Sequence, residues 1–195
     1  MGARQAQPRR QGRRCGSCLS RDGRAGTPLA ASPVTRPEGD ARPIPSRRHA
    51  ARLAAVQALY QWQEGQHGPQ EIVEQFINVR SSETGEGGMR RDADRPFFKE
   101  IVEGTAQHSA ELEQTITAAL AKDWTWARVD RLVRAILMAG AYELTHRRDV
   151  PARVAINEYV EIAHAFYDQG EPTFINSVLD RLARQARAAE LVKQA

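Results

Sequence analysis

The chain has 195 residues, of which 41% are hydrophobic, so it is long enough to bury one core of ordinary size. Its formal net charge of +4 is unevenly distributed, because residues 1–45 carry nine arginines and three acidic residues while the remainder is close to neutral. No apolar run is long enough for a signal peptide or a membrane span, which argues against a secreted or membrane protein. Nucleic-acid binding would therefore depend on a local basic patch.

Residues 1–45 contain six of the ten prolines, six glycines and no aromatic residue. Their few aliphatic side chains follow no period, so the segment cannot bury enough apolar area to offset its ordering entropy, and we predict that it is disordered. Both cysteines, Cys15 and Cys18, lie here. A single CxxC motif supplies half of a zinc site, and no second motif in the sequence completes it. We therefore predict reduced thiols, as in a cytoplasmic protein.

The first helix is predicted to run from Ser46, a residue type that commonly caps helices, to about Gln63. Its first turns contain Arg47, Arg48 and Arg52, although the positive end of the helix dipole disfavours cations there. A solvated charged face is the ordinary explanation for such residues. Because these arginines are not interleaved with acids and continue a basic segment, phosphate binding is the better explanation.

Apolar residues at helical spacing predict further helices at about 69–79, 94–121 with a bend at 104–108, 127–145, 151–166 and 172–186. The polar, glycine-rich stretch between the second and third of these regions lacks the ending of a phosphate-binding loop, so we predict a mobile loop. Gly140 would permit a close helix crossing, and Trp124 and Trp126 are predicted to be packing anchors. The alternating pattern of strands is absent, so the predicted class is all-α.

The sequence offers no catalytic constellation. No serine or cysteine nucleophile lies within a recognisable motif, and there is no glycine-rich dinucleotide loop. The five histidines lie on separate segments without metal-ligand spacing, at His49, His67, His108, His146 and His164. We therefore predict that the protein is not an enzyme and has neither a cofactor nor a metal site.

Three separated stretches resemble one known family in its own order. They are SRRHAARLAAVQALYQW at 46–62, RAILMAGAYEL at 134–144, and VAINE at 154–158 followed by FINSVLD at 174–180. They resemble the start, middle and end of the NusB family of bacterial transcription antitermination factors. The resemblance implies one helical domain over residues 46–190, with about seven helices in two packed three-helix subdomains.

The resemblance also implies a function. A NusB-like protein binds RNA and pairs with the small-subunit ribosomal protein that serves as NusE. The pair would hold single-stranded boxA RNA to the elongating RNA polymerase in the bacterial cytoplasm, supporting transcription of ribosomal RNA operons. One alternative is the detached NusB-like domain of a ribosomal RNA cytosine methyltransferase, which would need a catalytic domain beyond Ala195. Another is a helical scaffold that binds protein alone. Either a monomer or a homodimer is compatible with the sequence.

Several site residues follow from the resemblance. Arg48 and Arg52 match the arginine-rich start that contacts RNA in the family, and Arg47 is a further candidate. Tyr60 matches a family tyrosine at the interface with the ribosomal protein. An amphipathic phenol also suits the rim of a helix, where one edge of the ring is dry and the other wet.

Aromatic residues around the last interhelical loop complete the predicted RNA site: Phe166, Tyr167 and Phe174. Unpaired bases can stack on such rings, and the rings would lie near the arginines if the last two helices pack back on the first. Core packing is the alternative for Phe166 and Phe174, because both lie on apolar faces. Val133 and Met138 stand where relatives often carry an acid and an arginine, so no partner contact is carried over to them.

Overall fold

The computed structural model of the protein describes residues 46–78, 89–121, 124–168 and 170–192. The predicted disordered segment at 1–45 and most of the predicted glycine-rich loop lie outside these residues. The described part of the chain is helical and contains no strand, which confirms the predicted all-α class. Its helices are α1 (Arg47–Trp62), α2 (Pro69–Asn78), α3 (Arg95–Gln107), α4 (Ser109–Ala119), η1 (Trp126–Arg128), α5 (Arg131–His146), α6 (Ala152–His164), α7 (Glu171–Ala186) and α8 (Ala188–Val192).

Side-chain caps determine where helices begin. The Ser46 hydroxyl accepts a hydrogen bond from the backbone N–H of His49 at 3.0 Å, so α1 begins where predicted. The Asp130 carboxylate accepts from the backbone N–H of Leu132 at 2.9 Å. Because Asp130 is the cap, α5 begins at Arg131, later than predicted, and the preceding residues form the separate 3-10 turn η1.

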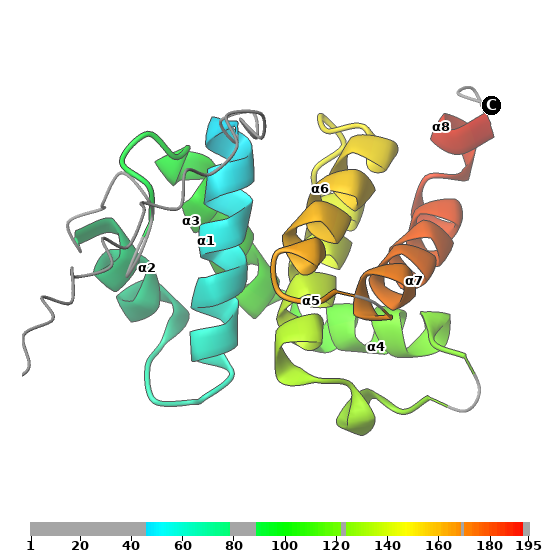
Figure 1. Ribbon diagram of the computed structural model, residues 1–195, viewed down its shortest axis with the longest axis horizontal. Coiled ribbons are helices and arrows are strands. Elements are labelled where there is room, and N and C mark those ends of the chain that lie inside the picture. Colours follow the sequence, from blue (N-terminus) through cyan, green and yellow to red (C-terminus); the bar gives the residue numbers. More distant parts are fainter. Residues whose placement is uncertain (1–45, 79–88, 122–123, 169, 193–195) are drawn as a thin grey trace, which may run out of the picture. The chain divides into compact units, whose positions relative to one another are not determined.

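The helices form two packed groups that meet along α1 and α5 (Figure 1). Helices α1, α2 and α3 contact one another, and so do α5, α6 and α7. Helix α5 also contacts α1 and α3, while α4 packs against α5 and α7. This arrangement agrees with the two expected three-helix subdomains. The short α8 after α7 was not predicted.

The core draws its largest fully buried side chains from both groups of helices. They include Leu59 of α1, Phe98 of α3, Ile136 of α5 and Tyr159 of α6. Each removes an apolar side chain from water, which contributes about 1.5–3 kcal/mol per large residue. None of the helices in the described ranges is long and apolar enough to cross a membrane.

The close helix crossing predicted at Gly140 is present. A Cβ atom placed on Gly140 of α5 would lie 2.9 Å from Leu179 Cδ2 of α7 and 3.3 Å from Tyr159 Cδ2 of α6. Both of these side chains are completely buried. The missing side chain therefore lets α5 approach α6 and α7 closely.

Candidate functional site

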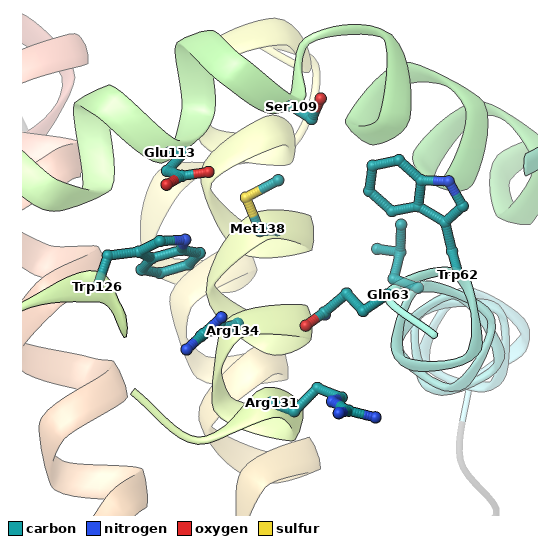
Figure 2. A pocket seen from close by; sticks show the side chains of 9 residues that line it. Trp62, Gln63, Ser109, Glu113, Trp126, Arg131, Arg134 and Met138 are labelled. Carbon is teal, nitrogen blue, oxygen red and sulfur yellow. The ribbon is translucent and has the colours of Figure 1, made fainter. Parts of the chain in front are cut away.

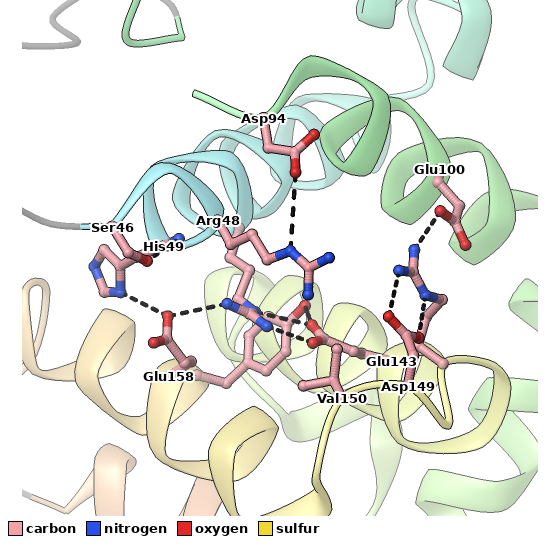
Figure 3. A network of polar contacts seen from close by, with 12 residues as sticks. Ser46, Arg48, His49, Asp94, Glu100, Glu143, Asp149, Val150 and Glu158 are labelled. Atoms are coloured by element: carbon pink, nitrogen blue, oxygen red, sulfur yellow. Dashed lines mark hydrogen bonds and ion pairs between the residues drawn. The ribbon is translucent and has the colours of Figure 1, made fainter. Parts of the chain in front are cut away.

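A buried ion network joins α1 to α5 and α6 (Figure 3). The Arg52 guanidinium donates from Nε to Glu143 Oε2 at 2.9 Å and from Nη2 to Glu143 Oε1 at 2.5 Å, forming a bidentate ion pair. Its Nη1 donates to Glu158 Oε2 at 3.1 Å. The Tyr159 hydroxyl donates to Glu143 Oε2 at 3.0 Å. The Arg52 side chain is only 3% exposed and that of Glu143 is fully buried.

The burial of Arg52 argues against its predicted contact with RNA phosphate. Its guanidinium is held by Glu143 and Glu158 and is closed to solvent, so Arg52 is not available to contact RNA. The spacing of apolar residues in the sequence already indicates that Arg52 is buried. Arg52 lies four residues before Val56 and seven before Leu59, both of which are buried, so it falls on the core-facing stripe of α1.

His49 completes the network beside Glu158. Its Nδ1 lies 3.0 Å from Glu158 Oε2, and this hydrogen bond raises the pKa of His49 and lowers the pKa of Glu158. Burial raises the pKa of Tyr159 well above its ordinary value, so its hydroxyl stays protonated and donates to Glu143. These contacts hold α1 against α5 and α6, so Glu158 has a structural role.

Arg47 and Arg48 are exposed at the start of α1, as the predicted RNA contacts require. Arg47 donates from Nε to the backbone carbonyl of Asp92 at 2.8 Å. Figure 3 shows Arg48 pointing toward Asp94, with Nε 3.8 Å from Oδ2 and its side chain 49% exposed. Its guanidinium carbon lies 5.2 Å from the centre of the Phe97 ring. An exposed ion pair of this length contributes little, so a phosphate can replace the carboxylate.

Arg147, which follows α5, was not predicted and adjoins this basic end of α1. Its guanidinium carbon lies 5.1 Å from the centre of the same Phe97 ring that Arg48 contacts. Arg147 also pairs with Glu100 and with Asp149, and its hydrogen bond lowers the pKa of Asp149 to about 2. Because these two acids compensate its charge, Arg147 attracts phosphate less than Arg48 does.

The aromatic residues of the α6–α7 loop meet Tyr60 of α1. Phe166 and Tyr167 line a groove of about 390 Å³ whose other walls are Gln57, Tyr60, Asp130 and Leu132. Phe166 is 44% exposed and Tyr60 is 41% exposed, so both rings face solvent. The Tyr167 hydroxyl donates to Asp130 Oδ1 at 2.6 Å, and this bond lowers the pKa of Asp130. Tyr167 therefore forms a fixed wall of the groove.

This placement differs from the predicted one, in which the aromatic rings lie beside the arginines. Tyr60 follows Arg48 by twelve residues, which corresponds to about 18 Å along α1 at 1.5 Å per residue. Phe166 and Tyr167 contact the groove at the Tyr60 end. Two of the predicted RNA residues, Phe166 and Tyr167, thus share a groove with the predicted partner residue Tyr60, while the exposed arginines lie at the other end of the helix.

Phe174 lies in a neighbouring groove with Trp124. The two ring centres are 4.8 Å apart, and Phe174 is partly buried. This second groove of about 410 Å³ is also lined by Arg128, Val129, Asp130, Val133, Gly170 and Glu171. Trp124 is 48% exposed and packs on Phe174, whereas the partly buried Trp126 packs against the core. Asp130 lines both grooves.

A third hollow lies between the end of α1, the start of α4 and α5 (Figure 2). It has a volume of about 400 Å³ and a mixed polar and apolar lining: Leu59, Trp62, Gln63, Ser109, Glu113, Trp126, Arg131, Arg134 and Met138. Met138 therefore lines a hollow that adjoins the last turn of α1, close to Tyr60. Val133 is buried, with a relative exposure of 2%. No sequence motif marks this hollow, because it arises from the packing of α1, α4, α5 and the 3-10 turn η1.

Comparison with known proteins assigns the chain to a family. The family model described as the NusB family matches residues 49–184. The transcription antitermination protein NusB of Rhodopseudomonas palustris (strain HaA2) is 44% identical over 166 residues, which cover 85% of this chain and 96% of that protein. The chain belongs to the NusB family. NusB of Rhizobium leguminosarum bv. trifolii (strain WSM2304) is 47% identical over 148 residues, which cover 75% of this chain and 92% of that protein.

The NusB fold is also found among solved structures. NusB of T. maritima matches with a TM-score of 0.60 and 24% identity, covering 76% of this chain and 99% of that one. A complex of the antitermination factors NusB and NusE with double-stranded RNA contains a chain that matches with a TM-score of 0.55 and 22% identity, covering 71% and 97%. These comparisons confirm the predicted family, fold and non-enzymatic antitermination class.

Proposed function

We propose that this NusB-family protein binds single-stranded boxA-type RNA together with a small-subunit ribosomal protein acting as NusE. The pair would join the elongating RNA polymerase complex in the cytoplasm and support transcription of ribosomal RNA operons. The observation that carries the proposal is the family match, because the closely similar relatives reported above are named for transcription antitermination. The solved complex of NusB and NusE with double-stranded RNA, which contains a chain of the same fold, supports RNA and a NusE-type protein as partners.

The RNA would run from the start of α1 to the groove near its end, passing part of the way around the helix, because Arg48 and Tyr60 lie about 120° apart on its surface. Arg47 and Arg48 supply exposed cations for phosphate at its start, and Phe166 offers an exposed ring for base stacking near its end. The intervening length of about 18 Å corresponds to roughly five nucleotides at the 3.4 Å spacing of a stacked strand. The contacting rings of Phe174 and Trp124, which are tilted by 32°, would extend the aromatic surface beyond the loop.

The ribosomal protein would bind at Tyr60. The guanidinium carbon of Arg131 lies 5.9 Å from the centre of the Tyr60 ring, and Arg131 pairs with Glu64. Tyrosine and arginine are both enriched at protein interfaces, and here the two side chains contact each other at an exposed position. The hollow of Figure 2 lies beside this turn of α1 and would receive side chains of the same partner.

Replacing both Arg47 and Arg48 by alanine should weaken RNA binding and reduce its salt dependence. Each lost phosphate contact lowers the magnitude of the slope of log K against log salt by about 0.7 for single strands, so two contacts lower it by about 1.4. A titration of fluorescently labelled boxA RNA at several salt concentrations measures both effects. Helicity should be unchanged, because both side chains are exposed.

Arg184→Ala is the matched control, because it removes an exposed arginine from α7, where Arg184 pairs with Asp180 of the preceding turn and with no other acid in the described ranges. The control should keep the parental affinity and slope. If the Arg47/Arg48 variant also keeps them, the basic start of α1 does not bind RNA, and the protein-only scaffold becomes the better explanation. The names of the relatives already favour antitermination over the methyltransferase alternative. Light scattering on the same samples decides between monomer and homodimer.

A further inference from the structure

Two histidines that are far apart in the sequence meet in the structure. His108 lies at the junction of α3 and α4, Glu111 follows in the first turn of α4, and His146 is the last residue of α5. One potential ligand atom from each residue lies within 4.8 Å of those from the other two. The two imidazole centres are 4.3 Å apart. No metal site was predicted from the sequence, because the contact between the two histidines is tertiary and leaves no spacing motif.

We propose that His108, Glu111 and His146 form a binding site for a divalent transition-metal ion, with zinc as the best match. Imidazole nitrogens and a carboxylate oxygen are ligands that zinc prefers. Two ligand atoms on a tetrahedral zinc ion, each about 2.0–2.1 Å from it, lie about 3.4 Å apart. His108 is partly buried and Glu111 and His146 are exposed, so rotation of their side chains would close the present spacing to that value. Water would occupy the fourth position.

Neighbouring residues hold His146 in an orientation suited to this role. The Thr145 hydroxyl lies 2.8 Å from the backbone carbonyl of Ala141 and 2.8 Å from His146 Nδ1. Because the Thr145 hydroxyl donates its hydrogen to this carbonyl, it accepts a hydrogen bond from Nδ1–H of His146. The proton of the neutral imidazole is then on Nδ1, so the lone pair of Nε2 can bind the metal. Such a second hydrogen bond is typical of histidines that ligate zinc.

The rings behind the site are fixed by packing. The Tyr142 ring stacks on His146 with centres 4.8 Å apart and an interplanar angle of 14°, and it also contacts His108 at 6.2 Å. Tyr142 in turn fills the space beside Gly104, where an added Cβ would lie 2.2 Å from the tyrosine hydroxyl oxygen. A small residue in α3 thus positions the tyrosine that supports both imidazoles. A bound ion would connect the α3–α4 junction to α5 and so join the two groups of helices.

Zinc binding by the full-length protein without an affinity tag tests the site. Because Cys15 and Cys18 can also ligate zinc, the measurement uses a Cys15→Ser/Cys18→Ser background and isothermal titration calorimetry with zinc chloride. We expect one zinc ion per chain. His108→Ala and His146→Ala should each weaken zinc binding by about tenfold or more. Replacing a residue that only hydrogen-bonds to a metal ligand already weakens metal binding by about tenfold or more. Glu111→Gln should have a smaller effect in the same direction.

His67→Ala is the matched control. His67 forms a similar histidine–carboxylate pair with Glu71 on α2, at 2.8 Å, but belongs to no cluster of three potential ligands among the described residues. This variant should bind zinc as the background does. Zinc should also raise the thermal midpoint of the background and of His67→Ala, and raise that of His146→Ala less at the same zinc concentration. Circular dichroism checks that each variant is folded. Failure of the background to bind zinc, or undiminished binding by folded His108→Ala and His146→Ala, overturns the proposal.

Discussion

Replacing Glu143 by alanine should lower the free energy of unfolding by about 3–5 kcal/mol. The substitution leaves the Arg52 guanidinium, whose side chain is 3% exposed, without its bidentate partner in the core. It also removes the acceptor of the buried Tyr159 hydroxyl. Glu158 keeps a single hydrogen bond to Arg52 and cannot replace both contacts. Urea unfolding followed by circular dichroism measures the loss.

A variant that removes the three most deeply buried members of the network tests the physical explanation. Arg52→Met, Glu143→Leu and Tyr159→Phe together replace the buried polar atoms with apolar groups of similar size. Because the cost of Glu143→Ala comes from an unpaired charge, the triple variant should recover most of the lost stability. A loss below about 1 kcal/mol in Glu143→Ala would mean that Arg52 reaches solvent, contrary to its burial.

The triple variant also separates the two roles considered for Arg52. If Arg52 acts only in packing α1 against α5 and α6, RNA affinity and its salt slope should match those of the parent. A slope reduced by about 0.7 would instead show a lost phosphate contact and restore the role inferred from the sequence. This comparison needs the triple variant, because a destabilised Glu143→Ala protein could lose RNA binding through unfolding.

The sequence predicted the helices well because their signals are local. Apolar spacing located the main helices, and Ser46 marked the start of α1. The start of α5 was misplaced because the apolar pattern begins before the actual cap at Asp130. Gly140 was interpreted correctly, since a glycine within an apolar helix has few explanations other than close packing.

The candidate site was less predictable because its contacts are tertiary. Nothing local reveals that Arg52 meets Glu143 and Glu158, although its spacing from buried residues places it on the core face. The positions of Phe166 and Tyr167 beside Tyr60 depend on how α6 and α7 pack against α1 and α5. A resemblance in sequence transfers residue types to positions, but packing decides which of them share a surface.

Changing Tyr60 to aspartate should abolish binding of the NusE-type ribosomal protein. The substitution removes an aromatic anchor and places an unpaired carboxylate in the proposed interface, where its desolvation is costly. Loss of a residue that dominates an interface costs at least about 2 kcal/mol, which is roughly a 30-fold loss of affinity. Tyr60 is 41% exposed, so the variant should keep its helicity. Calorimetry with the purified ribosomal protein measures the affinity.

Two companion variants resolve which ligand uses the groove that Tyr60 shares with Phe166. Tyr60→Phe keeps the ring and should retain most of the affinity for the ribosomal protein. Phe166→Ala should lower RNA affinity by about 1–3 kcal/mol through the loss of one stacked base, whereas Tyr60→Asp should leave intrinsic RNA binding unchanged. If Tyr60→Asp weakens RNA binding and spares the ribosomal protein, the whole groove belongs to RNA and the protein interface lies elsewhere. If instead Tyr60→Asp loses only the ribosomal protein and Phe166→Ala loses only RNA affinity, the Tyr60 edge binds protein and the Phe166 edge binds RNA. One groove would then hold both partners side by side.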